Sequence, residues 1–121
     1  MDSVLLWLGV ALLGGAGSVA RFLIDGVASQ ALARAYPLGT LLVNVSGSVV
    51  LGLLVGLALD KDAFLLAGTA TIGSYTTFST WSLESQRLAE EGSRWPALAN
   101  VVLSLALGVA AAALGRAIGS A

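Results

Sequence analysis

Four long apolar stretches without a charged residue divide this chain, and only short segments join them. Each stretch is close to the roughly 20 residues that a helix needs to cross a hydrocarbon core of about 30 Å. Strands are excluded because the stretches are too long and lack period-two alternation of apolar and polar residues. We therefore predict an all-α membrane protein with four transmembrane helices in a single transmembrane domain, residues 1–121. The expected spans are residues 3–24, 37–59, 63–86 and 95–116.

Composition supports a membrane protein and excludes several kinds of chemistry. Charged residues make up 11% of the chain and hydrophobic residues 57%, whereas roughly 25% of the residues in a soluble domain are charged. The absence of cysteine and histidine removes thiol chemistry, the usual neutral-pH base and the commonest metal ligand. No span carries a pair of carboxylates, so we predict that the chain is not an enzyme. A net charge of -1 gives no reason to expect a nucleic-acid partner.

Basic residues are divided almost evenly between the two sides of the membrane that four spans would create. Orientation normally follows an excess of Lys and Arg in the cytoplasmic loops, and this chain has little excess. It therefore either has too few charges for a clear preference or inserts in both orientations. With Arg21 set aside, three basic residues oppose two: Arg34, Arg87 and Arg94 against Lys61 and Arg116.

Polar and small residues recur every four positions along the second and fourth spans. Such stripes lie on one helix face, and small residues let two membrane helices approach closely. The stripes predict either a dense helix seam or a path lined by hydrogen-bond donors. A buried Asn44 amide can bridge helices or donate to a ligand. The stripes are Thr40, Asn44, Ser48, Gly52 and Gly56, and then Asn100, Ser104, Gly108 and Ala112.

The third span contains a poor helix-forming segment, "GSYTTFSTWSLE" (residues 73–84). Gly73 and Ser74 lie in mid-span beside β-branched threonines, which lowers helix propensity. We predict that the helix is broken near Gly73–Thr76. A break frees backbone carbonyls, which must find protein, water or an ion, and Na⁺ is one such partner. A kink that only packs against a neighbour is the alternative.

After the predicted break, hydroxyls and aromatics occupy adjoining faces of one helix. Thr76, Thr80 and Glu84 are four residues apart, while Phe78 and Trp81 are neighbours at a spacing of three. Aromatic edges turned inward would suit a small anion, and aromatic faces would suit a cation. Ring orientation does not follow from the sequence.

Two charged residues stand at the ends of predicted spans. Arg21 either snorkels to the interface or lines a watery vestibule. Glu84 would be costly at mid-membrane, so we expect it near an interface, protonated, or paired with Arg87.

Taken together, these motifs resemble those of the CrcB/Fluc family of fluoride channels. The resemblance rests on "GGAGSVARF" (14–22), "PLGTLLVNVSGS" (37–48), "GSYTTFSTWSLE" (73–84) and the stripe of the last span. It implies a fluoride-selective channel that lowers cytoplasmic fluoride by passive export across a prokaryotic inner membrane. It also implies a dual-topology, antiparallel dimer, in which a homodimer is expected and a heterodimer is the alternative.

The resemblance also implies roles for individual residues. A structural Na⁺ would be held by the backbone carbonyls of Gly73 and Thr76, Arg21 would lie in the vestibule, and Glu84 matches the family's glutamate. The implied fluoride pathway consists of Asn44, Thr77, Phe78, Thr80, Trp81, Asn100 and Ser104.

The chain departs from the family pattern in three places. Ser74 stands where a second glycine is usual, Trp81 where phenylalanine is usual, and Asn100 and Gly108 where hydroxyl residues are common. With these changes, an alternative is that the chain is one subunit of a heteromeric fluoride channel. A proton-coupled exporter of the small multidrug type is a further alternative, with Glu84 as its only candidate carboxylate. A partner or scaffold without transport activity is another.

Overall fold

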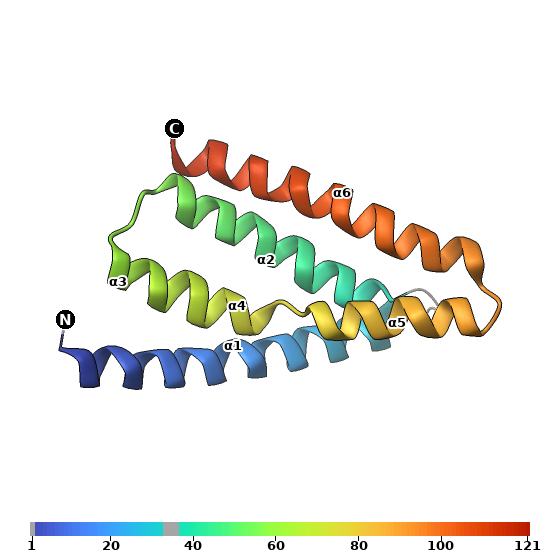
Figure 1. The fold of residues 1–121 in the computed structure, drawn as a ribbon, viewed down its shortest axis with the longest axis horizontal. Coiled ribbons are helices and arrows are strands. Elements are labelled where there is room, and N and C mark those ends of the chain that lie inside the picture. Colours follow the sequence, from blue (N-terminus) through green and yellow to red (C-terminus); the bar gives the residue numbers. More distant parts are fainter. Residues whose placement is uncertain (1, 33–36) are drawn as a thin grey trace.

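The computed structural model describes residues 2–32 and 37–121, with the side chains of Ser29 and Leu32 excepted, and this part of the chain forms helices joined by short connections, without a β-strand. Arg34, counted above as a basic loop residue, lies outside the described residues. The helices lie side by side in one bundle, with both termini at the same end (Figure 1).

Three of the helices are long and apolar enough to cross a membrane, so this is a multi-pass membrane protein. They are α1 (Ser3–Leu32), α2 (Leu38–Gly56) and α6 (Arg94–Gly119). Their apolar parts, Ser3–Ala28, Leu38–Gly56 and Arg94–Gly119, have mean hydropathies of 1.8, 2.0 and 2.2. They correspond to the first, second and fourth predicted spans, and α1 continues past residue 24.

The third predicted span is a row of helical pieces rather than one helix. It comprises α3 (Lys61–Phe64), a π-helix η1 (Leu65–Ile72), α4 (Gly73–Tyr75) and α5 (Phe78–Glu90). Asp60 starts this row, because its side chain accepts a hydrogen bond from Ala63 N at 2.8 Å.

The break in this row lies at the C-terminal edge of the predicted region. Gly73 is still helical (φ -59°, ψ -38°). The chain becomes extended at Thr76 (φ -80°, ψ 161°) and Thr77 (φ -144°, ψ 121°). Glycine therefore does not open the helix; two threonines do, three residues further along.

Glycines let the helix backbones meet directly. A side chain at Gly52 would collide with the Ala112 carbonyl of α6, and one at Gly115 would collide with the Val49 carbonyl of α2. On the other side of the bundle, Gly17 of α1 lies against the Thr71 carbonyl and the Ser74 side chain. The bundle is therefore two closely packed pairs, α2 with α6 and α1 with the row from η1 to α4 (Figure 1).

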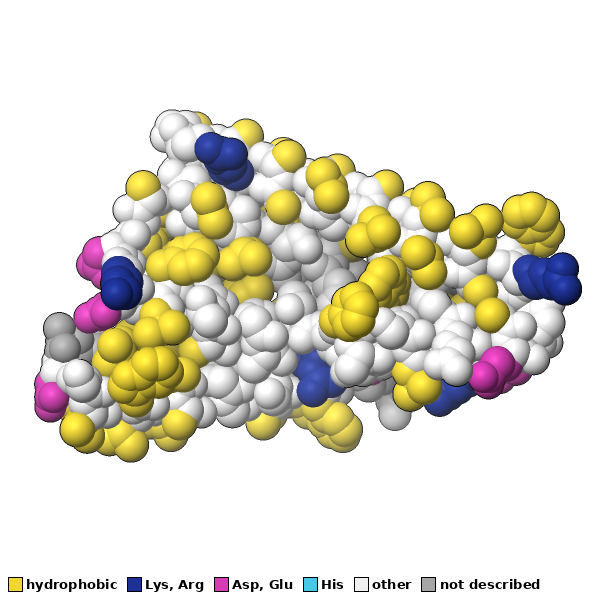
Figure 2. Space-filling view, viewed as in Figure 1, with side chains coloured by type: hydrophobic (Ala, Val, Ile, Leu, Met, Phe, Trp, Pro, Cys, Tyr) yellow, Lys and Arg dark blue, Asp and Glu magenta, His cyan; other side chains and the backbone are white. Residues whose placement is uncertain are grey.

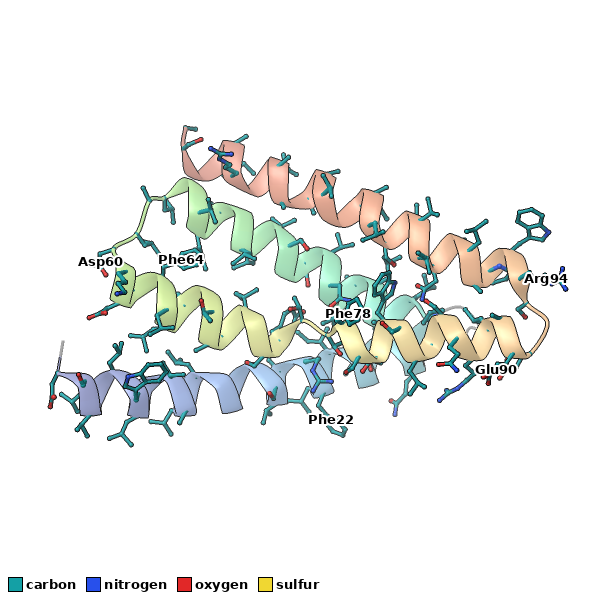
Figure 3. All side chains as sticks on the ribbon, in the orientation of Figure 1. Phe22, Asp60, Phe64, Phe78, Glu90 and Arg94 are labelled. Atoms are coloured by element: carbon teal, nitrogen blue, oxygen red, sulfur yellow. The ribbon has the colours of Figure 1, made fainter. Side chains whose placement is uncertain are left out.

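On the face shown in Figure 2, apolar side chains are spread along the bundle, and most charged side chains lie toward its two ends, with one basic side chain near mid-length. Asp60 lies at one end, and Glu90 and Arg94 lie at the other (Figure 3). This distribution matches a molecule whose middle is surrounded by lipid and whose ends reach the two interfaces.

Candidate functional site

The break between α4 and α5 is held by one side chain from α2. Asn44 Nδ2 donates to the Thr77 carbonyl at 2.9 Å, and the Thr77 N–H donates to Asn44 Oδ1 at 2.8 Å. The amide thereby satisfies both backbone groups that the loss of helix would leave bare in an apolar medium. Asn44 thus acts as a bridge between helices, and its second Nδ2 hydrogen has no acceptor among the described residues.

The same pair of bonds changes the hydrogen bonding at Gly73. In an unbroken helix the Thr77 N–H would donate to the carbonyl four residues earlier, which belongs to Gly73. Here that N–H is directed to Asn44. The Gly73 carbonyl therefore loses its helical donor, although Gly73 itself remains helical.

The first turn of α5 is capped by the residue at the break. Thr77 Oγ1 accepts a hydrogen bond from Thr80 N at 3.2 Å and donates to Thr80 Oγ1 at 3.2 Å. The positive end of the α5 dipole is thus fixed beside the break, a position that favours an anion.

A pocket of about 250 Å³ opens at this point. It combines polar groups of α2 and α6 with the break and the start of α5, and Asp, Glu, Lys and Arg are absent from its lining. Five of the seven predicted pathway residues line it, whereas Thr80 and Asn100 lie outside its wall. The lining consists of Asn44, Gly47, Ser48, Leu51, Thr76, Thr77, Phe78, Trp81, Ser104, Leu105 and Gly108.

The two aromatics of the pocket form an edge-to-face pair. The ring centroids of Phe78 and Trp81 are 5.3 Å apart, and their planes meet at 62°. Phe78 is 75% exposed and stands at the start of α5, beside the break (Figure 3). Trp81 is held more firmly, because its Nε1 donates to the Asn100 carbonyl at 3.0 Å.

Asn100 is buried at the α5–α6 contact, with 1% of its surface exposed. Its Nδ2 donates to Ser85 Oγ at 2.7 Å, and its Oδ1 accepts a long bond of 3.4 Å from Ser104 Oγ. Ser85 was not among the predicted site residues, although its spacing of four from Trp81 places it on the same helix face. Ser48, a residue of the polar stripe, was likewise not selected, and it lines the pocket beside Asn44.

Arg21 and Glu84 do not line the pocket. Arg21 Nε, Glu84 Oε1 and Thr40 Oγ1 are buried atoms with no hydrogen-bond partner among the described residues. The Glu84 carboxyl lies close to the Thr40 hydroxyl and within electrostatic range of Asp25 and Arg87. The predicted neighbour Arg87 is thus near Glu84, and an acid from α1 is near it as well.

A metal ion at the break would have to be held by backbone oxygen. The described residues contain no cluster of three or more His, Cys, Asp or Glu side chains that could hold a metal. Gly73 is exposed, and a side-chain carbon there would meet only the Gly68 carbonyl, at 4.0 Å. Thr76, in extended conformation, no longer directs its carbonyl along a helix axis. Backbone carbonyl oxygens are the kind of ligand that a hard cation such as Na⁺ prefers.

Comparison with known proteins identifies the family. A sequence profile of the family described as "CrcB-like protein, Camphor Resistance (CrcB)" matches residues 8–116. The chain belongs to the CrcB family. It is 58% identical over 116 residues to "Fluoride-specific ion channel FluC 2" of Mycolicibacterium paratuberculosis, covering 96% of this chain and 95% of that protein. A protein of the same name from Mycobacterium tuberculosis is 58% identical over 114 residues, covering 94% of this chain and 90% of its own length.

A more distant CrcB relative is similar over the same length. "Fluoride-specific ion channel FluC 1" of Symbiobacterium thermophilum is 38% identical over 119 residues, covering 93% of this chain and 96% of that protein. The CrcB family is a family of ion channels, which agrees with the prediction that the chain is not an enzyme.

The structure shows what the unusual residues of this CrcB chain do. Ser74 is half-buried within α4, and its hydroxyl is satisfied inside the helix, since its Oγ donates to the Ala70 carbonyl at 2.7 Å. Trp81 and Asn100 are joined to each other through the indole N–H. Two departures from the family pattern are therefore coupled, and both lie at the contact between α5 and α6.

Proposed function

We propose that this chain forms a fluoride-selective channel that lets fluoride leave the cytoplasm passively through a prokaryotic inner membrane. The observation that carries the proposal is the pocket at the helix break. Polar groups and an aromatic pair line it, and it contains no acidic side chain. Cation pathways usually carry rings of acidic side chains, which this lining lacks. The close CrcB relatives named as fluoride-specific ion channels support the choice of anion.

Few donors of the pocket are free to contact an anion. The Ser48 hydroxyl donates to the Asn44 carbonyl at 2.8 Å, and the Thr77 hydroxyl is used within α5. The remaining donors are the second Nδ2 hydrogen of Asn44 and the Ser104 hydroxyl, whose present bond is long. With the positive edge of Phe78, they would replace part of the hydration shell of fluoride.

In this proposal the row from α3 to α5 also crosses the membrane, which gives the chain four crossings. Two antiparallel copies then form the channel. Phe78 and Gly73, both exposed in the single chain, would then be covered by the second copy. An apolar groove of about 420 Å³ offers a further contact surface. Its lining consists of Ala16, Gly17, Ala20, Ser46, Val50, Thr71, Ile72 and Tyr75.

A structural Na⁺ would lie between the two copies at the break. The freed carbonyl of Gly73 and the carbonyl of Thr76 are its ligands in this proposal, and the second copy would supply the same pair. Thr76 Oγ1 donates to the Ile72 carbonyl at 3.1 Å, so its hydroxyl stabilises the helix end and leaves the backbone to the ion.

Efflux from proteoliposomes that contain this chain alone tests the proposal. We expect rapid release of fluoride and hardly any release of chloride. Equal fluxes of the two anions would contradict fluoride selectivity. Release only after a second, different chain is added would identify a heteromeric channel. The Glu84→Gln variant should still transport fluoride, and loss of transport together with loss of pH coupling would favour a proton-coupled exporter instead.

Thermal unfolding in different salts tests the ion. If Na⁺ binds only the folded dimer, raising the Na⁺ concentration from a value equal to its Kd to 100 times that value adds about 2.3 kcal/mol of stability. Potassium or choline at the same concentrations should not have this effect. Equal melting temperatures in all three salts would contradict the Na⁺ site and leave the channel proposal standing.

A further inference from the structure

A closed set of hydrogen bonds joins α5 to α6 behind the pocket. The Trp81 indole donates to the Asn100 carbonyl at 3.0 Å. The Asn100 amide donates to Ser85 Oγ at 2.7 Å, and the Ser85 hydroxyl donates back to the Trp81 carbonyl at 2.9 Å. Three residues therefore fix one another in a ring of contacts, which we call the indole lock.

The Asn100 amide of the lock is buried, whereas Trp81 and Ser85 are half-buried. Asn100 is 1% exposed and does not line the pocket. A buried amide that loses its partner costs the full desolvation of that group, so the Asn100–Ser85 bond holds the two helices at a fixed separation. That separation decides whether the indole of Trp81 can reach the Asn100 carbonyl.

We propose that Ser85, acting through Asn100, is a positioning residue that holds the Trp81 indole with its N–H turned into α6 and away from the ion path. The inference rests on the proposed anion pathway and deepens it. An indole N–H is a strong donor that would bind an anion tightly if it faced the pocket. Conduction needs sites weak enough to release the ion. With its N–H engaged by Asn100, Trp81 presents only ring carbon to the path.

The direct readout is the indole resonance of Trp81. The chain has three tryptophans, and Trp7 and Trp95 are 60% and 79% exposed, so a Trp7→Phe, Trp95→Phe background leaves Trp81 as the only indole signal. In Ser85→Ala we expect its ¹H–¹⁵N resonance to shift as the bond to Asn100 lengthens. Ser85→Thr keeps the hydroxyl and should restore it. Ser120→Ala is the matched control, since Ser120 makes the same kind of bond within α6, to the Arg116 carbonyl at 2.9 Å, at an exposed helix end.

Fluoride efflux supplies the second readout. We expect Ser85→Ala to slow efflux about threefold, the factor that an interhelical hydrogen bond of about 0.6 kcal/mol in a membrane implies. If Ser85 acts through the indole, the same substitution in a Trp81→Phe background should have no further effect. An unshifted resonance in Ser85→Ala, or effects of the two substitutions that multiply, would overturn the proposal. A shifted resonance in a chain that conducts no fluoride would keep the lock and refute the channel.

Discussion

Asn44 is the residue on which the site depends most directly. One amide side chain supplies a donor and an acceptor to the two backbone groups of Thr77, in the pattern by which strands pair. Serine or threonine could satisfy only one of the two groups well, and an apolar residue neither. The demand for an asparagine here therefore follows from the broken backbone as much as from an anion.

Substitutions at Asn44 should separate these two roles. Asn44→Ala removes both bonds to Thr77, so we expect a loss of about 1 to 3 kcal/mol of stability together with loss of fluoride efflux. Asn44→Asp keeps an acceptor for the Thr77 N–H, loses the donor to the Thr77 carbonyl and places a negative charge on the path. It should therefore fail to conduct fluoride and unfold more easily than wild type at neutral pH, and it should regain stability at low pH, where the protonated carboxyl can donate to that carbonyl. Thermal unfolding in detergent and efflux from liposomes measure the two effects, and wild-type values of both in Asn44→Ala would refute the assignment.

At the scale of elements, the sequence predicted the break near Gly73–Thr76, and the structure has it at the C-terminal edge of that region, at Thr76 and Thr77. Low propensity around Gly73 and Ser74 correctly indicated a weak helix in mid-span. The opening lies at Thr76 and Thr77 because Asn44, 33 positions earlier in the chain, captures the Thr77 backbone. A contact between distant segments cannot be predicted from local helix propensity. The π-helix η1, which precedes the break, cannot be predicted from it either.

For the predicted pathway, too, the periodicity of the sequence indicated which residues share a helix face but not which partners they contact. The four-residue stripes brought Asn44 and Ser104 to one pocket, as expected of residues on facing helix stripes. Periodicity could not tell that Asn100 would turn to Ser85 instead. That choice depends on the separation of α5 and α6, which is a property of the packed bundle.

The seam between α2 and α6 should tolerate no added methyl group where the two backbones meet directly, as at Gly52 and Gly115. Gly115→Ala would place a carbon against the Val49 carbonyl and Leu53 N, and backbone atoms cannot move aside as flexible side chains do. We expect a loss of about 1 to 3 kcal/mol in thermal unfolding. Gly15→Ala is the control, because nothing lies within 4 Å of the added carbon. A melting temperature for Gly115→Ala equal to that of Gly15→Ala would refute the close approach.

At the scale of the whole molecule, the groove beside α1 is the surface by which we expect two copies to join. Ala20→Trp would fill the groove and should convert dimers to monomers in single-molecule photobleaching in bilayers, with loss of efflux. Val19→Trp places the same side chain on the neighbouring, 58% exposed position and should leave the dimer intact. Dimers that persist in Ala20→Trp would assign the contact to another face.

Insertion in both orientations has a direct chemical test, since the chain has no cysteine of its own. Glu91 and Ala121 are exposed positions at opposite ends of α6. With Glu91→Cys or Ala121→Cys, a membrane-impermeant maleimide added outside intact cells should label about half of the molecules in each case, because basic residues give little preference. Complete labelling of one variant and none of the other would establish a single orientation.

The broken row from α3 to α5 also bears on how the protein is made. Within residues 2–32 and 37–121, three helices are long and apolar enough to cross a membrane, and α5 is not among them, since it carries Glu84, Arg87 and Glu90 within 13 residues. The partners that satisfy its polar groups are Asn44, already synthesised, and Asn100, which leaves the ribosome later. Segment 61–90 should therefore wait at the translocon until α6 emerges, and the two should enter the bilayer together as a hairpin.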